Sequence, residues 1–281
     1  MRLIAALLLL TACGKPAVVV GSKNFTESVL LGEIVAQRLE KSGCTVDRRL
    51  NLGGSLICDK AITSGQLDVY PEYSGTALTA ILGKAVATDR NAVTAQVRSA
   101  YAARQLRWGA PLGFENTFAM IVRRADAQRL GLRRISDLSR VAQNFRPGFG
   151  YEFTERPDGW SGLQKHYALQ FTTAPRTMDL GLTYRALAAG EVDLIAGNST
   201  DGLIDALNLI VLEDDRHFFP QYDAALVSRT DLGEKCSGAP AALESLVGTL
   251  DAARMRRLNY EVDGKHRDVA DVAKEFVAGL H

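Results

Sequence analysis

The sequence predicts an α/β protein of two lobes, each built on a sheet rich in parallel strands, with the chain crossing between the lobes twice. Expected strands alternate with expected helices along most of the chain, which is typical of sheets covered by helices. One structural plan also occurs twice, at residues 61–76 and 186–201. No Pro-rich or Gly-rich linker separates the two halves, and a hinged protein needs two crossings where a tandem pair of domains needs one connection.

The repeated plan runs from a helix through a glycine into a short strand and then into a polar loop. It reads AITSGQLDVYPEYSGT at 61–76 and ALAAGEVDLIAGNSTD at 186–201. Gly65 and Gly190 stand where a helix needs a residue that tolerates a positive φ in order to end. The apolar residues after each glycine are therefore expected to form a buried strand entered directly from the helix.

The two copies place different residues at the end of this strand. Counting from Asp68 and Asp193, the same offset reaches Tyr73 in the first copy and Asn198 in the second. Open α/β sheets bind ligands beyond the carboxyl ends of their strands. One such loop in each half predicts a binding site between the two lobes.

The first half is expected to alternate strands and helices on one sheet. Three valines at 18–20 predict a buried strand, and Thr26 is the expected N-cap of the helix that follows. Gly43 is expected to end that helix. The expected elements are a strand at 18–20, a helix at 27–41, a strand at 46–50, a helix ending at Gly65, a strand at 67–70 and a helix at 88–104.

The second half is expected to repeat this alternation after a first crossing at 108–123, where Phe118, Met120 and Val122 alternate with the period of a strand. The predicted boundaries are 17–115 with 216–281 for lobe I and 116–215 for lobe II. The expected elements are a helix at 124–130, a strand at 146–153, a helix at 159–169, a strand near 172–178, a helix at 182–189, a strand at 192–196, returning segments at 209–212 and 224–229, and C-terminal helices at 240–256 and 266–280 that pack on lobe I.

The composition is that of an ordinary globular protein. The chain has 281 residues, of which 47% are hydrophobic and 23% charged, and its formal net charge is +1. That length allows two domains or one large one. Nucleic-acid binding usually requires a concentrated basic surface, whereas the Arg-Arg pairs of this chain are dispersed, so no nucleic-acid partner is expected.

The N-terminus predicts export. Met1 and Arg2 precede an apolar run at 3–10, which has the order of a secretory signal and is too short to span a bilayer. The run ends in Leu-Thr-Ala-Cys, which resembles the lipobox of bacterial lipoproteins, with Cys13 as the lipid-modified residue. We therefore expect residues 1–12 to be a lipoprotein signal peptide. The mature protein would be extracytoplasmic and held to a membrane by its lipid, in the periplasm or at the cell surface.

Three further cysteines leave their pairing open. An exported protein could join two of Cys44, Cys58 and Cys236, and the odd number leaves one over. Cys58 lies on an apolar helix face and is expected to be a buried free thiol. Neither a Cys-x-x-Cys spacing nor a His-rich segment supports a metal site, and no cofactor is expected.

The sequence lacks the common motifs of catalysis. It has no G-x-S-x-G elbow, no P-loop and no G-x-G-x-x-G fingerprint, and its four histidines lie apart. Without a nucleophile, a base or a metal cluster, the protein is not expected to be an enzyme.

The expected strand ends offer aromatic rings and a few cationic or hydrogen-bonding groups. Aromatic faces attract cations, each by about 0.5 to 2 kcal/mol when water is excluded, and Lys or Arg suits a carboxylate. Each ring taken singly would be assigned to packing, but their joint placement in loops favours a ligand site. The candidate ligand-binding residues are Lys23, Tyr73, Thr76, Phe118, Arg156, Asn198 and Tyr222.

Six segments form a recognisable set. They are GSKNFTES at 21–28, NLGG at 51–54, DVYPEYSGTAL at 68–78, GFENTFA at 113–119, STDG at 199–202 and FFPQYDAALV at 218–227. Together they resemble the substrate-binding proteins of osmoprotectant ABC importers, the glycine betaine, carnitine and choline group. The resemblance implies a two-lobed periplasmic-binding-protein fold of type II that closes on a quaternary ammonium ligand in an aromatic cage, with an ABC permease and its ATPase as partners.

The same resemblance implies roles for the candidate residues. Tyr73 and Tyr222 would be walls of the cage. Lys23, Thr76 and Arg156 would contact a carboxylate of the ligand.

Two positions depart from the pattern of the family. Phe118 stands where a tyrosine is usual, which keeps a ring and loses a hydroxyl, and Asn198 stands where a tyrosine is common, so an amide replaces one wall. A bulkier betaine, or a zwitterion that needs a hydrogen bond, is therefore an expected ligand. The alternatives are a receptor for another zwitterion such as an amino acid, and an α/β enzyme on the same scaffold.

Overall fold

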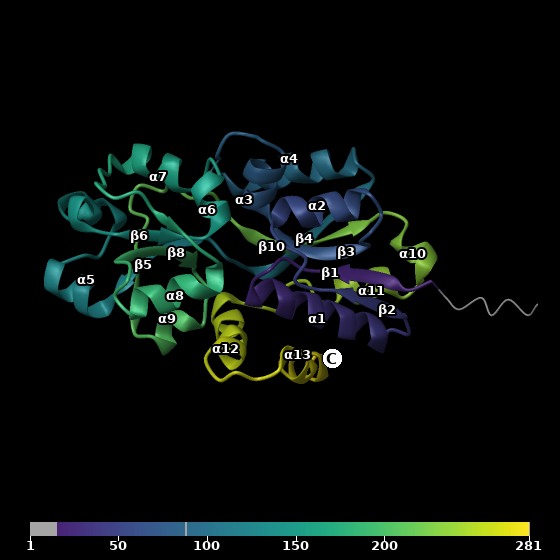
Figure 1. The fold of residues 1–281 in the computed structure, drawn as a ribbon. Coiled ribbons are helices and arrows are strands. Elements are labelled where there is room, and N and C mark those ends of the chain that lie inside the picture. Colours follow the sequence, from purple (N-terminus) through teal and green to yellow (C-terminus); the bar gives the residue numbers. More distant parts are fainter. Residues whose placement is uncertain (1–15, 88, 281) are drawn as a thin grey trace, which may run out of the picture.

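The computed structural model describes residues 16–280 apart from residue 88, so the expected signal peptide and Cys13 lie outside the described residues. The described chain forms two sheets, each with its own helices, in two bodies that lie side by side (Figure 1). Within this range no helix is both long and apolar enough to cross a membrane.

The first sheet draws its strands from both halves of the chain. In spatial order they are β2 (Val46–Arg49), β1 (Val18–Gly21), β3 (Val69–Tyr73), β10 (Asp223–Arg229) and β4 (Leu106–Glu115). β1 is parallel to β2 and β3, whereas β10 is antiparallel to β3 and β4. The late strand β10 therefore lies between β3 and the edge strand β4 and joins them into one sheet.

The second sheet repeats this arrangement. In spatial order its strands are β7 (Arg176–Thr177), β6 (Pro147–Phe149), β8 (Leu194–Asn198), β5 (Phe118–Arg123) and β9 (Leu209–Leu212). β6 is parallel to β7 and β8, and β5 is antiparallel to β8 and β9. β8 thus occupies the position in its sheet that β3 occupies in the first.

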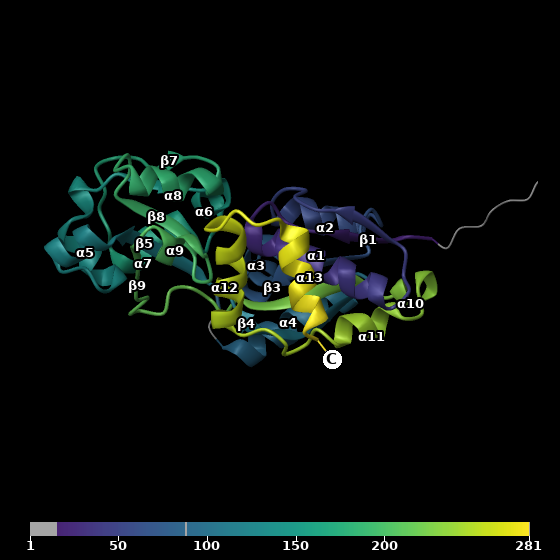
Figure 2. The ribbon, with the colours of Figure 1, turned by 90° about the horizontal axis from the view of Figure 1, so that it is seen from below.

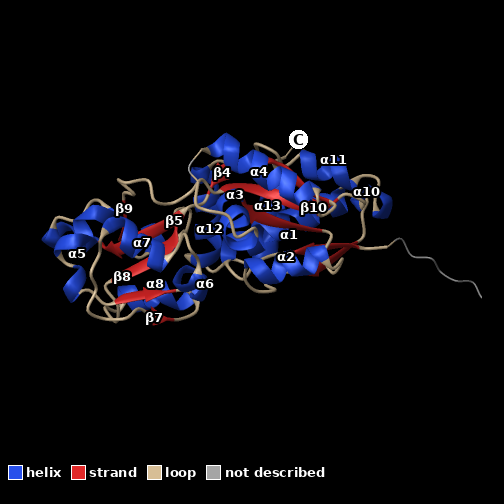
Figure 3. Cartoon of the chain, turned by 90° about the horizontal axis from the view of Figure 1, so that it is seen from above, coloured by secondary structure: helices blue, strands red, loops and turns tan. Residues whose placement is uncertain are grey.

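Helices cover both sheets (Figure 3). Around the first sheet they are α1 (Thr26–Lys41), α2 (Ser55–Thr63), α3 (Ser74–Thr76) continued by a π-helical turn (Ala77–Ile81), α4 (Arg90–Ala102), α10 (Leu232–Lys235), α11 (Ala239–Glu244), α12 (Ala252–Asp263) and α13 (Val269–Ala278). Around the second they are α5 (Arg124–Leu130), α6 (Tyr151–Glu155), α7 (Trp160–Tyr167), α8 (Leu180–Ala188) and α9 (Leu203–Ala206), with 3₁₀ turns at Ile135–Arg140 and Ala142–Asn144.

The C-terminal helices pack on α1, as expected. Seen from below, α12 and α13 lie beside α1, and α12 stands at the border between the two bodies (Figure 2). The apolar face of α1, with Leu30, Ile34 and Leu39, is buried in the core that α13 completes through Val272 and Phe276. This packing fixes the N-terminal end of α1, which borders the site described below.

The repeated plan of the sequence is visible in matching hydrogen bonds. The carboxylate of Asp68 accepts a hydrogen bond from the backbone N–H of Val19 at 2.8 Å, and that of Asp193 accepts one from Arg146 at 3.1 Å. The glycine that follows the helix before each strand has a φ of 77° in the first copy and 73° in the second. The end of β3 and the end of β8 are therefore equivalent places in the two sheets.

Two expected strands are shorter than predicted. The strand expected at 146–153 is limited to Pro147–Phe149, and the chain enters α6 at Tyr151. The strand expected near 172–178 is limited to Arg176–Thr177. The first ends early because the chain turns into α6, so that only Pro147 and Gly148 pair with β8, and the second begins late, with only Arg176 and Thr177 paired to β6.

Two helix predictions are also wrong in detail. The helix expected at 240–256 is broken between α11 and α12, because the backbone N–H groups of Gly248 and Leu250 bond to carbonyls in β4 instead of continuing a helix. Thr26 is not the N-cap of α1. Phe25 occupies that position, and the Thr26 hydroxyl donates to Asp263 at 2.6 Å.

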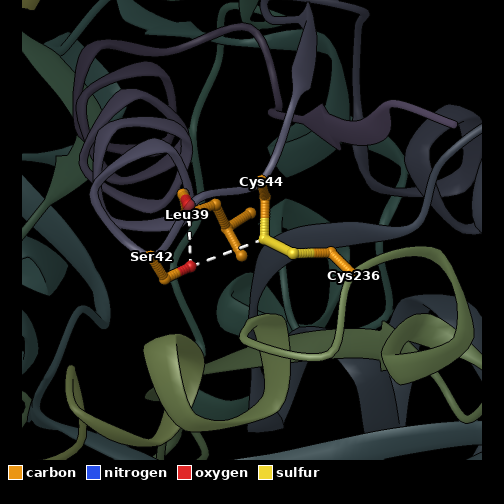
Figure 4. The surroundings of a disulfide bond; sticks show 4 residues. All are labelled: Leu39, Ser42, Cys44 and Cys236. Carbon is orange, nitrogen blue, oxygen red and sulfur yellow. Dashed lines mark hydrogen bonds between the residues drawn. A yellow bond between two sulfur atoms is a disulfide. The ribbon is translucent and has the colours of Figure 1, made fainter. Parts of the chain in front are cut away.

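The disulfide that the sequence left open joins Cys44 to Cys236, and it ties the end of α1 to the segment after α10 (Figure 4). The Ser42 hydroxyl lies 3.4 Å from the Cys44 sulfur and donates to the carbonyl of Leu39 at 2.7 Å. Cys58 is a buried free thiol, as predicted, and its burial raises its pKa to about 12.

Candidate functional site

A cavity of about 180 Å³ lies between the two sheets, at the carboxyl ends of β3 and β8. Residues from both bodies line it, among them Gly54 from the first and Leu180 from the second. All seven residues predicted from the sequence lie on its wall: Lys23, Tyr73, Thr76, Phe118, Arg156, Asn198 and Tyr222. The structure therefore brings the predicted residues together in one place, although it does not test what each of them binds.

Tyr73 is the last residue of β3, and its ring is held by a buried carboxylate. Its hydroxyl donates to Glu27 at 2.6 Å, and only 3% of the residue is exposed. Phe25 lies beside it, with ring centroids 6.1 Å apart. Burial raises the pKa of Tyr73 well above its usual value, so the residue is a neutral hydrogen-bond donor at neutral pH.

Glu27 connects four segments that are far apart in the sequence. Besides Tyr73, it accepts hydrogen bonds from Asn116 at 2.8 Å, from Thr200 at 2.5 Å and from Asn259 at 3.0 Å. These residues lie between β4 and β5, after β8 and on α12. Burial raises the pKa of Glu27, and the four donors oppose that effect. One carboxylate thus links the first sheet, the crossing segment, the second sheet and the C-terminal helices.

Tyr222 is held in a similar way by Asp158. The Tyr222 hydroxyl donates to Asp158 at 2.6 Å, and that carboxylate also accepts hydrogen bonds from Thr79 at 2.9 Å and from two nitrogens of Arg156 at 2.8 and 2.5 Å. Although burial opposes ionisation, Arg156 and the two hydroxyls keep the pKa of Asp158 below its usual value. Asp158 comes from the second body and Tyr222 from the second crossing, so this cluster also joins different parts of the chain.

Both cations of the site are paired with carboxylates and lie over rings. Lys23 forms an ion pair with Glu72 at 2.6 Å, and its Nζ lies 4.5 Å from the centroid of the Tyr73 ring. The guanidinium of Arg156 lies 4.8 Å from the centroid of Phe118, and its Nη1 donates to Thr76 at 3.2 Å. Desolvation raises the pKa of Glu72, an effect that Lys23 reduces.

Phe118 and Asn198 are neighbours on the wall of the cavity. Phe118 packs edge-on against Tyr222 with centroids 5.8 Å apart, and it pairs with Asn198 across β5 and β8. The side-chain nitrogen of Asn198 lies 3.3 Å from both carboxylate oxygens of Asp201, which also accepts from the Tyr184 hydroxyl at 2.6 Å. Burial raises the pKa of Asp201 to about 7.

One contact beside the cavity joins the two bodies. Glu152, on α6, accepts a hydrogen bond from the backbone N–H of Ser55 at 2.6 Å, at the start of α2. The side chain of Glu152 also lies 3.6 Å from Arg156 and is 44% exposed. This contact joins the two bodies directly at the cavity.

Negative charge outweighs positive charge around the cavity. Glu72 and Asp158 already balance the two cations, and Glu152 and Asp179 also line the wall. In a region of low dielectric constant such a site favours a ligand with a positive group. In the described part of the chain, no group of three or more His, Cys, Asp or Glu side chains could hold a metal ion.

Sequence reasoning missed the buried carboxylates that hold the rings. Glu27 and Glu72 lie inside the recognisable segments at 21–28 and 68–78, and Asp158 comes two residues after Arg156. An acidic residue within four positions of a predicted site residue was the available signal. Most hydrogen-bond partners of these carboxylates could not be predicted, because they come from distant segments.

Replacing Glu27 by Gln should destabilise the protein, because at least one buried donor then loses its acceptor. We expect the free energy of unfolding to fall by about 1 to 3 kcal/mol, measured by urea denaturation without ligand. The matched control is Glu40→Gln on the same helix, where Glu40 forms a partly exposed pair with Arg48 and the loss should stay below about 1 kcal/mol. Equal losses in the two variants would contradict the role given to Glu27.

Comparisons with known proteins agree with this geometry. Residues 16–279 match the family described as the substrate-binding domain of ABC-type glycine betaine transport systems. The chain is 35% identical over 272 residues to the glycine-betaine-binding protein of Pseudomonas aeruginosa, covering 93% of this chain and 87% of that protein. It is 34% identical over 269 residues to the ergothioneine transport permease/ergothioneine binding protein EgtU of Helicobacter pylori, covering 93% of this chain and 47%, about half, of that protein.

A solved structure agrees as well. A crystal structure of a glycine betaine/carnitine/choline ABC transporter superimposes with a TM-score of 0.75 at 31% identity, covering 93% of this chain and 97% of that one. The predicted fold, a two-lobed periplasmic-binding-protein fold of type II, is thereby confirmed, with mixed sheets. Proteins of this family are extracytoplasmic substrate-binding proteins that work with a permease, and they are not enzymes. The chain belongs to the family of substrate-binding domains of ABC-type glycine betaine transport systems.

Proposed function

We propose that this substrate-binding protein captures a betaine-type zwitterion or quaternary amine in the cavity between the two sheets. The observation that carries the proposal is the convergence of three rings and two cations on one cavity, from segments spread between residues 23 and 222. The names of the relatives support the same class of ligand: glycine betaine in one case and ergothioneine in another.

The cationic group of the ligand is proposed to bind near Tyr222. Lys23 and Arg156 already lie over Tyr73 and Phe118. In the part of the chain that the structure describes, no protein cation lies over the ring of Tyr222. An ammonium group can therefore use that ring, with the other two rings as neighbouring walls.

The carboxylate of the ligand is proposed to bind to Arg156, Lys23 and Thr76. Asp158 takes two nitrogens of the guanidinium and leaves further N–H groups of Arg156 available. Pairing with carboxylates reduces the net positive charge around both cations. It also holds their N–H donors in fixed directions, so these side chains lose less conformational entropy when the ligand binds.

A second candidate ligand is another zwitterion such as an amino acid. The specific observation in its favour is the amide of Asn198 held by Asp201, which gives one wall hydrogen-bonding groups where a ring would complete a cage. Competition between amino acids and betaines for one site would identify it.

The wider setting of the protein is proposed from the N-terminal sequence and the family. Lipid attached at Cys13 would anchor the protein to a membrane. An ATPase would drive the permease. Residues 17–115 with 216–281 and residues 116–215 are proposed to act as two lobes that close on the ligand, with the contact between Glu152 and Ser55 joining them in the closed state.

Calorimetric titration tests the proposed function most simply. The wild-type protein should bind at least one of glycine betaine, proline betaine, carnitine, choline and ergothioneine. Tyr222→Phe keeps the ring, whereas Tyr222→Leu removes it while keeping an apolar side chain. We expect the Tyr222→Leu variant to bind a quaternary amine about 2-fold to 30-fold more weakly than the Tyr222→Phe variant. This difference corresponds to about 0.5 to 2 kcal/mol of binding free energy.

Failure of all five compounds to bind would reject the quaternary-amine part of the proposal. Equal affinities of the Phe and Leu variants would show that the ammonium does not use this ring. Both variants lose the hydroxyl bond to Asp158, so the comparison between them isolates the aromatic face.

Removing the pair of Arg156 and Asp158 together tests the carboxylate role. The double variant Arg156→Met, Asp158→Asn avoids a buried unpaired charge. We expect the double variant to bind glycine betaine at least tenfold more weakly than the wild-type protein, because a charge-assisted hydrogen bond contributes about 1.5 to 3 kcal/mol. Its affinity for choline, which has no carboxylate, should fall much less. The matched control removes the partly exposed pair of Arg229 and Asp231.

Equal losses for choline and glycine betaine in the Arg156 double variant would contradict the assignment of the carboxylate end. Thermal unfolding of each variant shows whether it is folded before its affinity is compared.

A further inference from the structure

The segment 199–202, which follows β8, lies against helix α12. It is one of the six recognisable segments of the sequence, and the N–H of Ser199 donates to the carbonyl of Thr117 in the first crossing at 2.9 Å. α12 comes from the C-terminal end of the chain and stands at the border between the two bodies (Figure 2). We call the place where the two meet the seat, defined by residues 199–202 and by Arg256, Asn259 and Tyr260 of α12.

The seat is a contact between the two bodies. On one side, α12 belongs to the first body: Met255 is fully buried in the same core as α1, and Asp263 accepts a hydrogen bond from Thr26, the first residue of α1, at 2.6 Å. On the other side, residues 199–202 continue from the second sheet into α9. The bodies are therefore linked here in addition to the two crossings of the chain.

The two backbones of the seat approach most closely at Gly202. A Cβ at this position would lie 2.4 Å from the backbone nitrogen of Tyr260 and 2.5 Å from its Cα, closer than a real Cβ comes to such atoms. The backbone of Gly202 has ordinary helical angles, with φ at −66° and ψ at −24°, which other residues adopt as well. Glycine is therefore required here by the approach of α12 and not by the local turn.

Hydrogen bonds hold the two backbones at this distance. Asn259 is 1% exposed, and its side-chain nitrogen donates to the carbonyl of Thr200 at 2.9 Å and to Glu27 at 3.0 Å. The guanidinium of Arg256 donates to the carbonyl of Ser199 at 3.4 Å. The close approach at Gly202 is thus fixed by bonds on the two residues after Asn198.

The seat borders the ligand cavity without being part of it. Asn198, the residue before the segment, lines that cavity, whereas Gly202 and Tyr260 do not. A substitution at Gly202 can therefore change how closely the two bodies approach each other without removing a contact to the ligand.

We propose that Gly202 is a positioning residue for closure: it lets the loop after β8 settle on α12, and this contact sets how closely the second body approaches the first. The inference rests on the closure of two lobes that the proposed function includes. It goes beyond that function because it places a determinant of affinity outside the ligand cavity. A side chain at position 202 holds the bodies apart in the closed arrangement and is tolerated once they have separated.

Binding kinetics distinguish a role in closure from a structural role. A ligand enters the open arrangement and is retained by the closed one, so a variant that hinders closure releases it faster. We expect Gly202→Ala to raise the dissociation rate of glycine betaine by about fivefold or more and to change its association rate by less than about twofold, measured by stopped-flow fluorescence. Asn259→Ala loses the bond to Thr200 without adding an atom and should act in the same direction, and it decides the question if Gly202→Ala does not fold.

Gly233→Ala is the matched control. Gly233 lies in α10 of the first body, and a Cβ there would lie 3.5 Å from Pro240, which is an ordinary contact. We expect this variant to leave both rates unchanged.

The distance between the two bodies gives a second measurement, which needs no ligand. Leu56 on α2 and Leu182 on α8 are exposed, so spin labels can replace them, carried on unnatural amino acids so that no cysteine reacts. With and without glycine betaine, Gly202→Ala should show a larger share of long distances between the labels than Gly233→Ala.

Unchanged dissociation rates and unchanged label distances in the folded Gly202→Ala and Asn259→Ala variants would overturn the inference and leave the proposed function standing. A lower melting temperature of Gly202→Ala without either change would show a structural role only and would overturn it as well. If the wild-type protein binds none of the five compounds named above, the proposed function fails. The label distances of the ligand-free protein then still decide whether Gly202 sets the approach of the bodies.

Discussion

A buried carboxylate at the start of α1 is the constraint on which the rest of the site depends. Glu27 accepts hydrogen bonds from Tyr73, Asn116, Thr200 and Asn259, which lie in four different parts of the chain. Removing a carboxylate from water is costly unless its oxygens are satisfied. Because the donors come from both sheets, from the crossing between them and from α12, they can satisfy Glu27 only when these parts are assembled. The orientation of the Tyr73 ring is thus linked to the arrangement of the whole molecule.

Asp158 repeats this principle on the other side of the cavity. It holds Tyr222 and Arg156, and Arg156 in turn lies over Phe118. In each case a carboxylate behind the wall fixes an aromatic ring, and the ring itself is left facing other rings and cations. Groups that are fixed before the ligand arrives lose little entropy on binding. The arrangement also keeps the site slightly negative, which suits a ligand with a permanent positive charge.

Much of this could be predicted from the sequence because it depends on local pattern. The repeated plan at 61–76 and 186–201 predicted two equivalent strand ends, and the structure places Tyr73 and Asn198 there. The seven candidate residues were predicted from loop positions and from a resemblance, and they line one cavity. Their contacts with a ligand, and the exact limits of the two lobes, remain predictions.

What could not be predicted depends on contacts between distant segments. The break between α11 and α12 arises from bonds to β4, and the strand expected at 146–153 ends early because the chain turns into α6 at Tyr151. The pairing of Cys44 with Cys236 and the acceptor role of Glu27 likewise join residues that are far apart in the sequence. Such partners are set by the assembled fold, whereas periodicity reports only on the segment itself.

A crystal structure with glycine betaine bound tests the central claim most directly. The account predicts that the quaternary nitrogen lies within about 6 Å of the centroid of the Tyr222 ring, and that the carboxylate accepts hydrogen bonds from Arg156 or Lys23. A ligand bound away from the border between the two sheets, or one whose carboxylate faces Tyr222 while its ammonium lies beside Arg156, would contradict it.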